Sequence, residues 1–143
     1  MLLGEYRHNL DDKKRLAVPT KFRSLLKEGA VLTRGLDTCL FLYPKKAWAA
    51  WAEKLAALPI SQARSRAFAR MMLGGAMEVP IDGQGRITIP DYLQEFAHLQ
   101  KQVVIAGLYD RLEIWDAGAW QQYTSQTEKE NDHIAETLAS LGV

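Results

Sequence analysis

The sequence has few of the residues that build disulfides, metal sites or membrane spans. Its single cysteine, Cys39, cannot form a disulfide within the chain, and the apolar run around it predicts a small buried side chain, which fits a reducing compartment. The three histidines, His8, His98 and His133, lie far apart and form no pair at metal-ligand spacing. No apolar run approaches the roughly 20 residues that span a bilayer. We therefore expect no metal, no cofactor and no membrane segment.

Motifs of catalysis are missing as well. No glycine-rich loop follows a strand to cradle a phosphate, because the stretch from Gly83 to Gly85 is too short, and no serine lies in a nucleophile elbow. Asp11 and Asp82 could be read as a catalytic carboxylate pair. Each, however, has an arginine four residues further on, which favours a pairing or structural role. We expect that the protein is not an enzyme.

Charge is plentiful but unevenly distributed. The net charge is +1, yet residues 1–74 carry 14 Lys or Arg against 6 Asp or Glu, a net charge of +8. Residues 75–143 carry 4 against 11, a net charge of −7. A basic half suggests a polyanionic partner, and opposite halves also allow head-to-tail contact between copies.

One short motif occurs twice. Residues 11–19 read Asp-Asp-Lys-Lys-Arg-Leu-Ala-Val-Pro, and residues 82–90 read Asp-Gly-Gln-Gly-Arg-Ile-Thr-Ile-Pro. In each copy an Asp opens a turn, an Arg follows four positions later, and an alternating strand ends in Pro. An offset of 71 relates the two motifs, and an offset of 72 relates Gly35 to Gly107 and Leu40 to Leu112. The pattern predicts an internal duplication with one inserted residue.

Each repeat reads as strand, turn, strand, a helix begun by proline, two β-rich runs around a glycine turn, and a further helix, which predicts an α+β fold. The tail from Ala117 onward reads as one long amphipathic helix whose two aromatic residues favour packing against the protein. We divide the chain into a first repeat (1–48), connecting helices (49–74), a second repeat (75–120) and a C-terminal helix (121–143).

The repeated turn suits nucleic acid. Asp and Arg at its two ends can pair, which would fix the direction of the guanidinium and leave donors free. A planar guanidinium bonds two acceptors at once, as in phosphate or guanine, and a two-stranded ribbon fits a DNA groove. The first copy adds Lys13, Lys14 and the nearby Arg7, whereas the second has only Arg86 as a cation. We expect Arg15 to enter the groove and the other cations of the first copy to hold phosphates.

These residues resemble the MraZ family, bacterial regulators associated with the division and cell-wall gene cluster. The resemblance covers nearly the whole chain: residues 4–11 (Gly-Glu-Tyr-Arg-His-Asn-Leu-Asp), the Arg15–Pro19 strand, the Gly35 turn, Arg66 and Arg70 with Met71, and residues 82–90. It implies two AbrB-like (double-psi, swapped-hairpin) modules, related by pseudo-symmetry, that form a β-barrel-like core with flanking helices.

The resemblance also implies a function. It implies a transcriptional regulator, most simply a repressor, located in the cytoplasm at the nucleoid. Such a protein would bind direct repeats in double-stranded DNA as a ring of identical subunits. The DNA-contacting residues carry over onto Asp11, Lys13, Lys14 and Arg15, and onto Asp82 and Arg86. Because Gly83, Gln84 and Gly85 replace the lysines, the second turn could contact DNA or serve the fold alone.

Two other functions remain open from the residues. An antitoxin-type AbrB-like protein would bind a toxin as well as its own operator, through a tail that folds on the partner. A scaffold that does not bind DNA, or a small barrel enzyme, is the third hypothesis.

Overall fold

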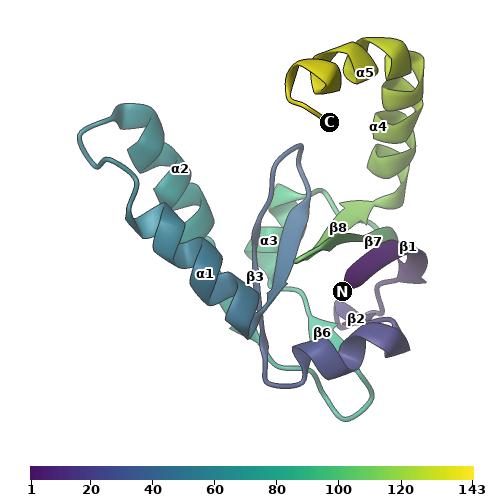
Figure 1. Cartoon of the computed structure of the whole chain (residues 1–143). Coiled ribbons are helices and arrows are strands. Elements are labelled where there is room, and N and C mark those ends of the chain that lie inside the picture. Colours follow the sequence, from purple (N-terminus) through teal and green to yellow (C-terminus); the bar gives the residue numbers. More distant parts are fainter.

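The computed structural model describes residues 1–143 as an α+β protein built on one six-stranded antiparallel sheet and one two-stranded ribbon (Figure 1). The strands are β1 (Leu2–Asn9), β2 (Arg15–Ala17), β3 (Ala30–Arg34), β4 (Leu40–Pro44), β5 (Met77–Val79), β6 (Arg86–Thr88), β7 (Gln102–Tyr109) and β8 (Leu112–Asp116). The helices are η1 (Thr20–Leu26, a 3₁₀ helix), α1 (Lys45–Ala56), α2 (Ala63–Gly74), α3 (Asp91–Phe96), α4 (Ala117–Lys129) and α5 (Asn131–Ser140). None of these helices is long and apolar enough to cross a membrane.

The elements repeat at the two offsets found in the sequence. Strand β6 lies 71 residues after β2, strand β8 lies 72 after β4, and α4 begins 72 residues after α1. Strand follows strand in the same order in both halves, with η1 of the first half replaced by α3 in the second. The two halves are therefore copies of one α+β unit.

The two repeats exchange strands. The sheet order is β1-β7-β8-β4-β3-β5, so β1 of the first repeat pairs with β7 of the second, and β5 of the second pairs with β3 of the first. The β1–β7 pairing runs without interruption from Leu2 opposite Tyr109 to Asn9 opposite Gln102. Because each repeat supplies an edge strand to the other, neither has a complete sheet of its own.

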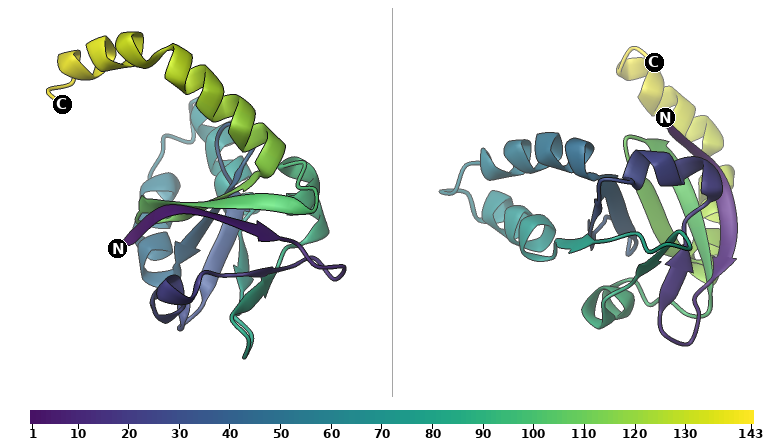
Figure 2. Two further views of the ribbon diagram at one scale, coloured as in Figure 1. Left: turned by 90° about the vertical axis from the view of Figure 1, so that its right-hand side faces the viewer. Right: turned by 90° about the horizontal axis from the view of Figure 1, so that it is seen from below.

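The ribbon of β2 and β6 closes the core. Each edge strand of the sheet passes through an Asp turn into one strand of the ribbon, where Leu16 lies opposite Ile87. These two side chains belong to a cluster of 20 buried residues that fills the space between the sheet and the ribbon, with η1 and α3 at its sides (Figure 2). This enclosed, barrel-like core is the rigid base from which both turns project.

A second apolar cluster covers the other face of the sheet. Phe41, Tyr43 and Trp115 from the sheet pack with Leu55 of α1 and Met72 of α2. Trp120, at the start of α4, lies edge to face against Trp115 with ring centroids 5.2 Å apart. The aromatic residues thus anchor the beginning of α4 to the sheet.

The prediction of one long C-terminal helix is wrong in its continuity, whereas its two aromatic residues pack as expected: Trp120 and Tyr123 lie 5.2 and 5.0 Å from Trp115, between ring centroids. Helix α4 ends at Lys129, α5 begins at Asn131, and neither contains a buried residue. Between Tyr123 and Ile134 the sequence offers only polar residues, so nothing holds this part of the tail against the sheet. The last turns of α4 and all of α5 consequently leave the body of the protein, as Figure 1 shows in yellow.

Candidate nucleic-acid interface

The first turn is fixed by the carboxylate of Asp11. Its Oδ1 accepts hydrogen bonds from the backbone N–H groups of Lys13 and Arg15, both at 2.9 Å. Its Oδ2 accepts from Nε of Arg15 at 2.6 Å. One carboxylate therefore shapes the backbone of the turn and holds the guanidinium that follows it.

The second turn repeats this geometry. Oδ1 of Asp82 accepts from the backbone N–H groups of Gln84 at 2.8 Å and Arg86 at 2.9 Å, and Oδ2 accepts from Nε of Arg86 at 2.9 Å. The residues between Asp and Arg differ completely between the copies. The shared geometry thus depends on the Asp and the Arg alone, as their spacing in the sequence indicates.

Both arginines keep donors available. Only Nε of Arg15 and of Arg86 bonds within the chain, so the two terminal Nη groups of each guanidinium have no partner. The side chains of Arg15 and Arg86 are 31% and 27% exposed. A guanidinium with a fixed Nε and free terminal nitrogens presents a fork of the shape that guanine or a phosphate accepts.

The hydrogen bonds also fix the charge of the acids. The backbone N–H of Arg15, more than any other group, holds the pKa of Asp11 below its ordinary value, and the Arg15 guanidinium acts in the same direction. The N–H and guanidinium of Arg86 lower the pKa of Asp82 in the same way. Both carboxylates are therefore ionised at neutral pH and remain paired with their arginines.

The ribbon places the two turns apart. Arg15 lies opposite Thr88 and Arg86 lies opposite Ala17, so the arginines stand at opposite ends of the β2–β6 pairing. The N–H groups of Ile89 and Val18 extend this pairing by bonding the carbonyls of Lys14 and Gly85, each at 2.9 Å. The two loops project at separate corners of the molecule (Figure 2, left). A single chain thus offers two related but separate contact points.

The surroundings of the first turn differ from the sequence-based expectation for Lys14. Its Nζ donates to Oδ1 of Asp91, at the start of α3, at 2.8 Å. Lys13 is exposed and makes no ion pair. Arg7 lies on β1, outside the turn, where it lines a shallow cleft with Gln102 and Ala117. Three cations were expected to bind phosphate: Arg7, Lys13 and Lys14. Of these, only Lys13 lies in the turn and makes no ion pair.

Sequence reasoning missed Arg23 at the second turn. Arg23 belongs to η1, and its side chain lies directly over Gly85, where it would collide with any Cβ at that position. Its Nε donates to the carbonyl of Val18 at 2.9 Å, which leaves its terminal nitrogens free. Arg23 thus adds a second cation to this turn, whose own residues include only one, Arg86. The signal in the sequence was the pair Gly83 and Gly85, which leaves room beside the backbone for a side chain from another element.

Other chemistry has little support in this arrangement. No group of three His, Cys, Asp or Glu side chains lies close enough together to hold a metal ion. Cys39 is buried, as predicted, and burial raises the pKa of its thiol, which disfavours the reactive thiolate.

Comparison with known proteins agrees with the repeated unit. The family described as "MraZ protein, putative antitoxin-like" matches twice, over residues 1–71 and 72–141. Proteins named "Transcriptional regulator MraZ" from Halothermothrix orenii, Natranaerobius thermophilus and Moorella thermoacetica are 46%, 45% and 43% identical to this chain. Each alignment spans 143 residues and covers 100% of both proteins. The resemblance noted in the sequence is thereby confirmed, and the chain belongs to the MraZ family.

Proposed function

We propose that this chain is a sequence-specific DNA-binding transcriptional regulator whose contacts are the two Asp-x-x-x-Arg turns. The observation that carries the proposal is the pair of arginines held by Nε, with their terminal nitrogens free. The relatives' name, transcriptional regulator, supports the same function. Preorganised guanidinium groups at projecting turns are suited to reading base edges, because little side-chain entropy is lost on binding.

In the first turn, Arg15 enters the major groove and Lys13 binds the phosphate backbone. Arg7, on the adjacent strand, adds a second phosphate contact. Lys14 contributes less than its position in the sequence suggests, since it must leave Asp91 before it can bind a phosphate. Asp11 does not touch DNA in this proposal; it positions Arg15.

In the second turn, Arg86 reads the groove and Arg23 binds the phosphate. Asp82 positions Arg86 as Asp11 positions Arg15. A cleft of about 330 Å³ beside this turn is lined by Arg23 and Lys27 on one side and by Asp82 and Gly85 on the other. Because Arg86 neutralises Asp82, the cleft presents two cations to an incoming phosphate.

Several subunits together would bind more tightly than one. A turn that neutralises a few phosphates binds weakly at physiological salt, whereas a ring of subunits presents many such turns to repeated sites. In our proposal the ring occupies direct repeats upstream of the division and cell-wall gene cluster, at the nucleoid in the cytoplasm, and represses transcription there. In this proposal the chain consists of a first repeat (1–48), connecting helices (49–74), a second repeat (75–120) and a C-terminal helix (121–143).

The proposal is tested by DNA binding of an Arg15→Ala variant. We expect fluorescence anisotropy with DNA from upstream of the protein's own gene to show a loss of at least tenfold in affinity. Arg64→Ala, an exposed change on α2 away from both turns, is the matched control and should bind as the wild type does. Equal affinity of the Arg15→Ala variant and the wild type would remove the turn from DNA binding.

A second candidate function is that of an antitoxin-type protein. The observation that favours it is the exposed apolar face of α5, which could bind another protein. Co-purification of a protein encoded by a neighbouring gene, lost when residues 131–143 are deleted, would support this candidate. If no such protein co-purifies, the antitoxin candidate is rejected and the transcriptional regulator is the remaining candidate.

A further inference from the structure

We propose that α5 of one subunit binds in the groove between η1, α1 and the beginning of β1 in a second copy of this chain. The inference rests on the proposed ring and names the two surfaces that would join its subunits. It is independent of which DNA sequence the ring reads.

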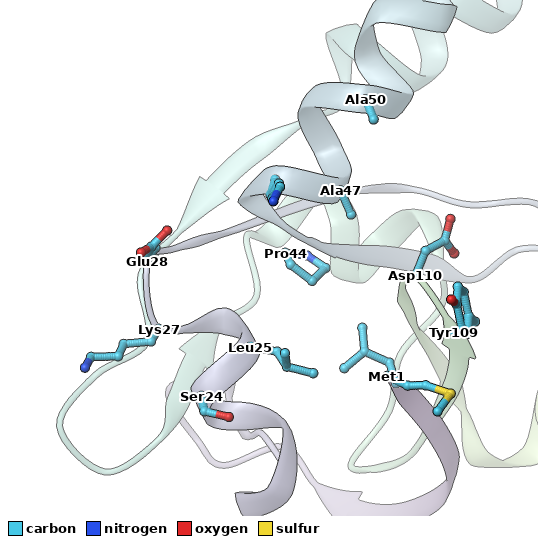
Figure 3. A pocket seen from close by; sticks show the side chains of 12 residues that line it. Met1, Ser24, Leu25, Lys27, Glu28, Pro44, Ala47, Ala50, Tyr109 and Asp110 are labelled. Carbon is cyan, nitrogen blue, oxygen red and sulfur yellow. The ribbon is translucent and has the colours of Figure 1, made fainter.

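The groove is an open apolar cavity of about 790 Å³. Its apolar lining comes from the chain start at Met1 and Leu2, from Leu25 of η1 and from Tyr109 of β7 (Figure 3). Pro44, Ala47 and Ala50 complete it at the start of α1. Leu25 and Tyr109 are 45% and 68% exposed. Figure 3 shows Leu25 directed into the open space, with Met1 and Tyr109 on its far side. A cavity of this size and composition is suited to the apolar face of a helix.

Helix α5 has a matching stripe. Ile134, Leu138 and Leu141 are spaced by four and three residues, so they share one face of the helix and its end. No residue of α5 is buried, and Leu141 is 70% exposed. In Figure 1, α5 lies at the opposite end of the molecule from η1 and on the opposite side of the view from α1, so the stripe does not fill the chain's own groove.

Half of the exposed large hydrophobic side chains lie at these two places, six of the twelve in the chain. Those that line the groove are Met1, Leu25 and Tyr109, and those of the tail are Leu138, Leu141 and Val143. Exposed apolar patches mark surfaces that bind other molecules, and a second copy of the chain can bind both of these patches.

The charges around the surfaces are complementary. Residues 20–46, which provide much of the groove, carry six Lys or Arg against Glu28 and Asp37. Residues 128–143 carry four Asp or Glu against Lys129 alone. Two of the cations, Lys27 and Lys46, line the groove itself, together with the acids Glu28 and Asp110. The acidic tail of one copy is therefore attracted to the basic η1–α1 region of the next.

A contact between two different surfaces is head to tail. Every subunit that gives its tail to a neighbour keeps an empty groove for another, so the chain of contacts closes into a ring or grows into a filament. A second copy of this protein is thus the occupant that explains why both surfaces occur on one chain.

Light scattering of full-length variants tests the inference. We expect the tail variant, Leu138→Glu with Leu141→Glu, to run as single chains of 16.1 kDa. The groove variant, Leu25→Glu, should do the same. Each variant keeps one intact surface, so an equal mixture of the two should form a 1:1 dimer and nothing larger. Ile60→Glu, in the exposed loop between α1 and α2, is the control and should assemble as the wild type does.

Other outcomes would overturn the inference. If the tail variant assembles as the wild type does, the subunits meet through other surfaces, and the proposed ring and regulator still stand. A mixture that gives no dimer would have the same meaning, provided that circular dichroism shows both variants folded. A wild-type protein that is monomeric at micromolar concentration would reject the ring together with the docking, while DNA binding through Arg15 could still be measured on the monomer.

Discussion

Lys14 and Gly85 occupy the same position in the two turns and share a left-handed backbone, with φ of 59° and 78°. The N–H of each donates to the carbonyl of the Asp three residues earlier at 3.0 Å. Glycine adopts this conformation without strain, whereas a lysine does so at a cost. The first turn has thus kept a cation where the backbone favours a glycine.

A Lys14→Gly change should stabilise the protein. Relief of the left-handed strain is expected to raise the free energy of unfolding by roughly 0.5–1 kcal/mol, less the small contribution of the exposed Lys14–Asp91 ion pair. Urea denaturation measures the change. Gly85→Ala is the reciprocal variant, and it should be destabilising by about 1 kcal/mol or more, because its Cβ would meet the Arg23 side chain. If Lys14→Gly destabilised the protein as Gly85→Ala does, the two positions would not share the same preference for glycine.

Acid should weaken the two turns selectively. The pKa of Asp11 and that of Asp82 lie below the ordinary value of 3.8 in the folded protein. A depressed folded pKa gives stability that is present above the unfolded pKa, about 4, and lost as the pH falls through the folded value.

The double variant Asp11→Asn, Asp82→Asn should therefore be less stable than the wild type at pH 7, and the difference should shrink below about pH 4. Urea denaturation between pH 2.5 and 7 tests this. Asp12→Asn is the control, since Asp12 is exposed and forms none of the hydrogen bonds of the turn. A stability difference that stays constant down to pH 2.5 would show that the carboxylates are not coupled to folding.

Arg23 should contribute one phosphate contact at the second turn. Arg23→Gln is expected to lower the slope of log affinity against log salt concentration by about 0.9, the value for one phosphate. Arg23→Lys should keep the slope, because it keeps the charge, although it loses the bond from Nε to Val18. Arg70→Gln, on the exposed side of α2, serves as the comparison. An unchanged slope for Arg23→Gln would assign Arg23 a purely structural role over Gly85.

The indoles of Trp51 and Trp115 should respond differently to replacement by Phe. Nε1 of Trp51 is buried without a hydrogen-bond partner, whereas Nε1 of Trp115 donates to Oε1 of Glu113 at 3.1 Å. Trp51→Phe removes an unsatisfied donor. Trp115→Phe removes the donor to Oε1 of Glu113, whose Oε2 still accepts from Arg111. We expect the Trp115 variant to lose about 1–2 kcal/mol more stability in urea denaturation. The opposite order would show that packing of the larger ring outweighs the hydrogen bond.

The repeats and the turns could be predicted from the sequence because they depend on neighbours along the chain. All hydrogen bonds that shape the first turn join Asp11 to residues no more than four positions away. The hydrophobic alternation around Leu16 and Ile87 likewise predicted the strands that form the ribbon. Interactions of this kind can be predicted from residues that are close together in the sequence.

The cations that serve each turn could not be predicted in the same way. Lys14 is paired with Asp91, and Gly85 is covered by Arg23, in both cases by a residue of the other repeat. These contacts exist because the repeats exchange strands, which brings η1 to the second turn and α3 to the first. The placement of a residue from a distant part of the chain is a property of the whole fold.

The sequence by itself determined that the chain is duplicated, that each copy carries an Asp–Arg turn, and that charge is divided between the halves. Only the tertiary structure decided which cations are free at each turn, that the arginines stand at opposite ends of the ribbon, and that α5 leaves the body. The physical reason is the range of the interactions. Turns are stabilised by bonds within five residues, whereas the burial of a side chain depends on every element that packs against it.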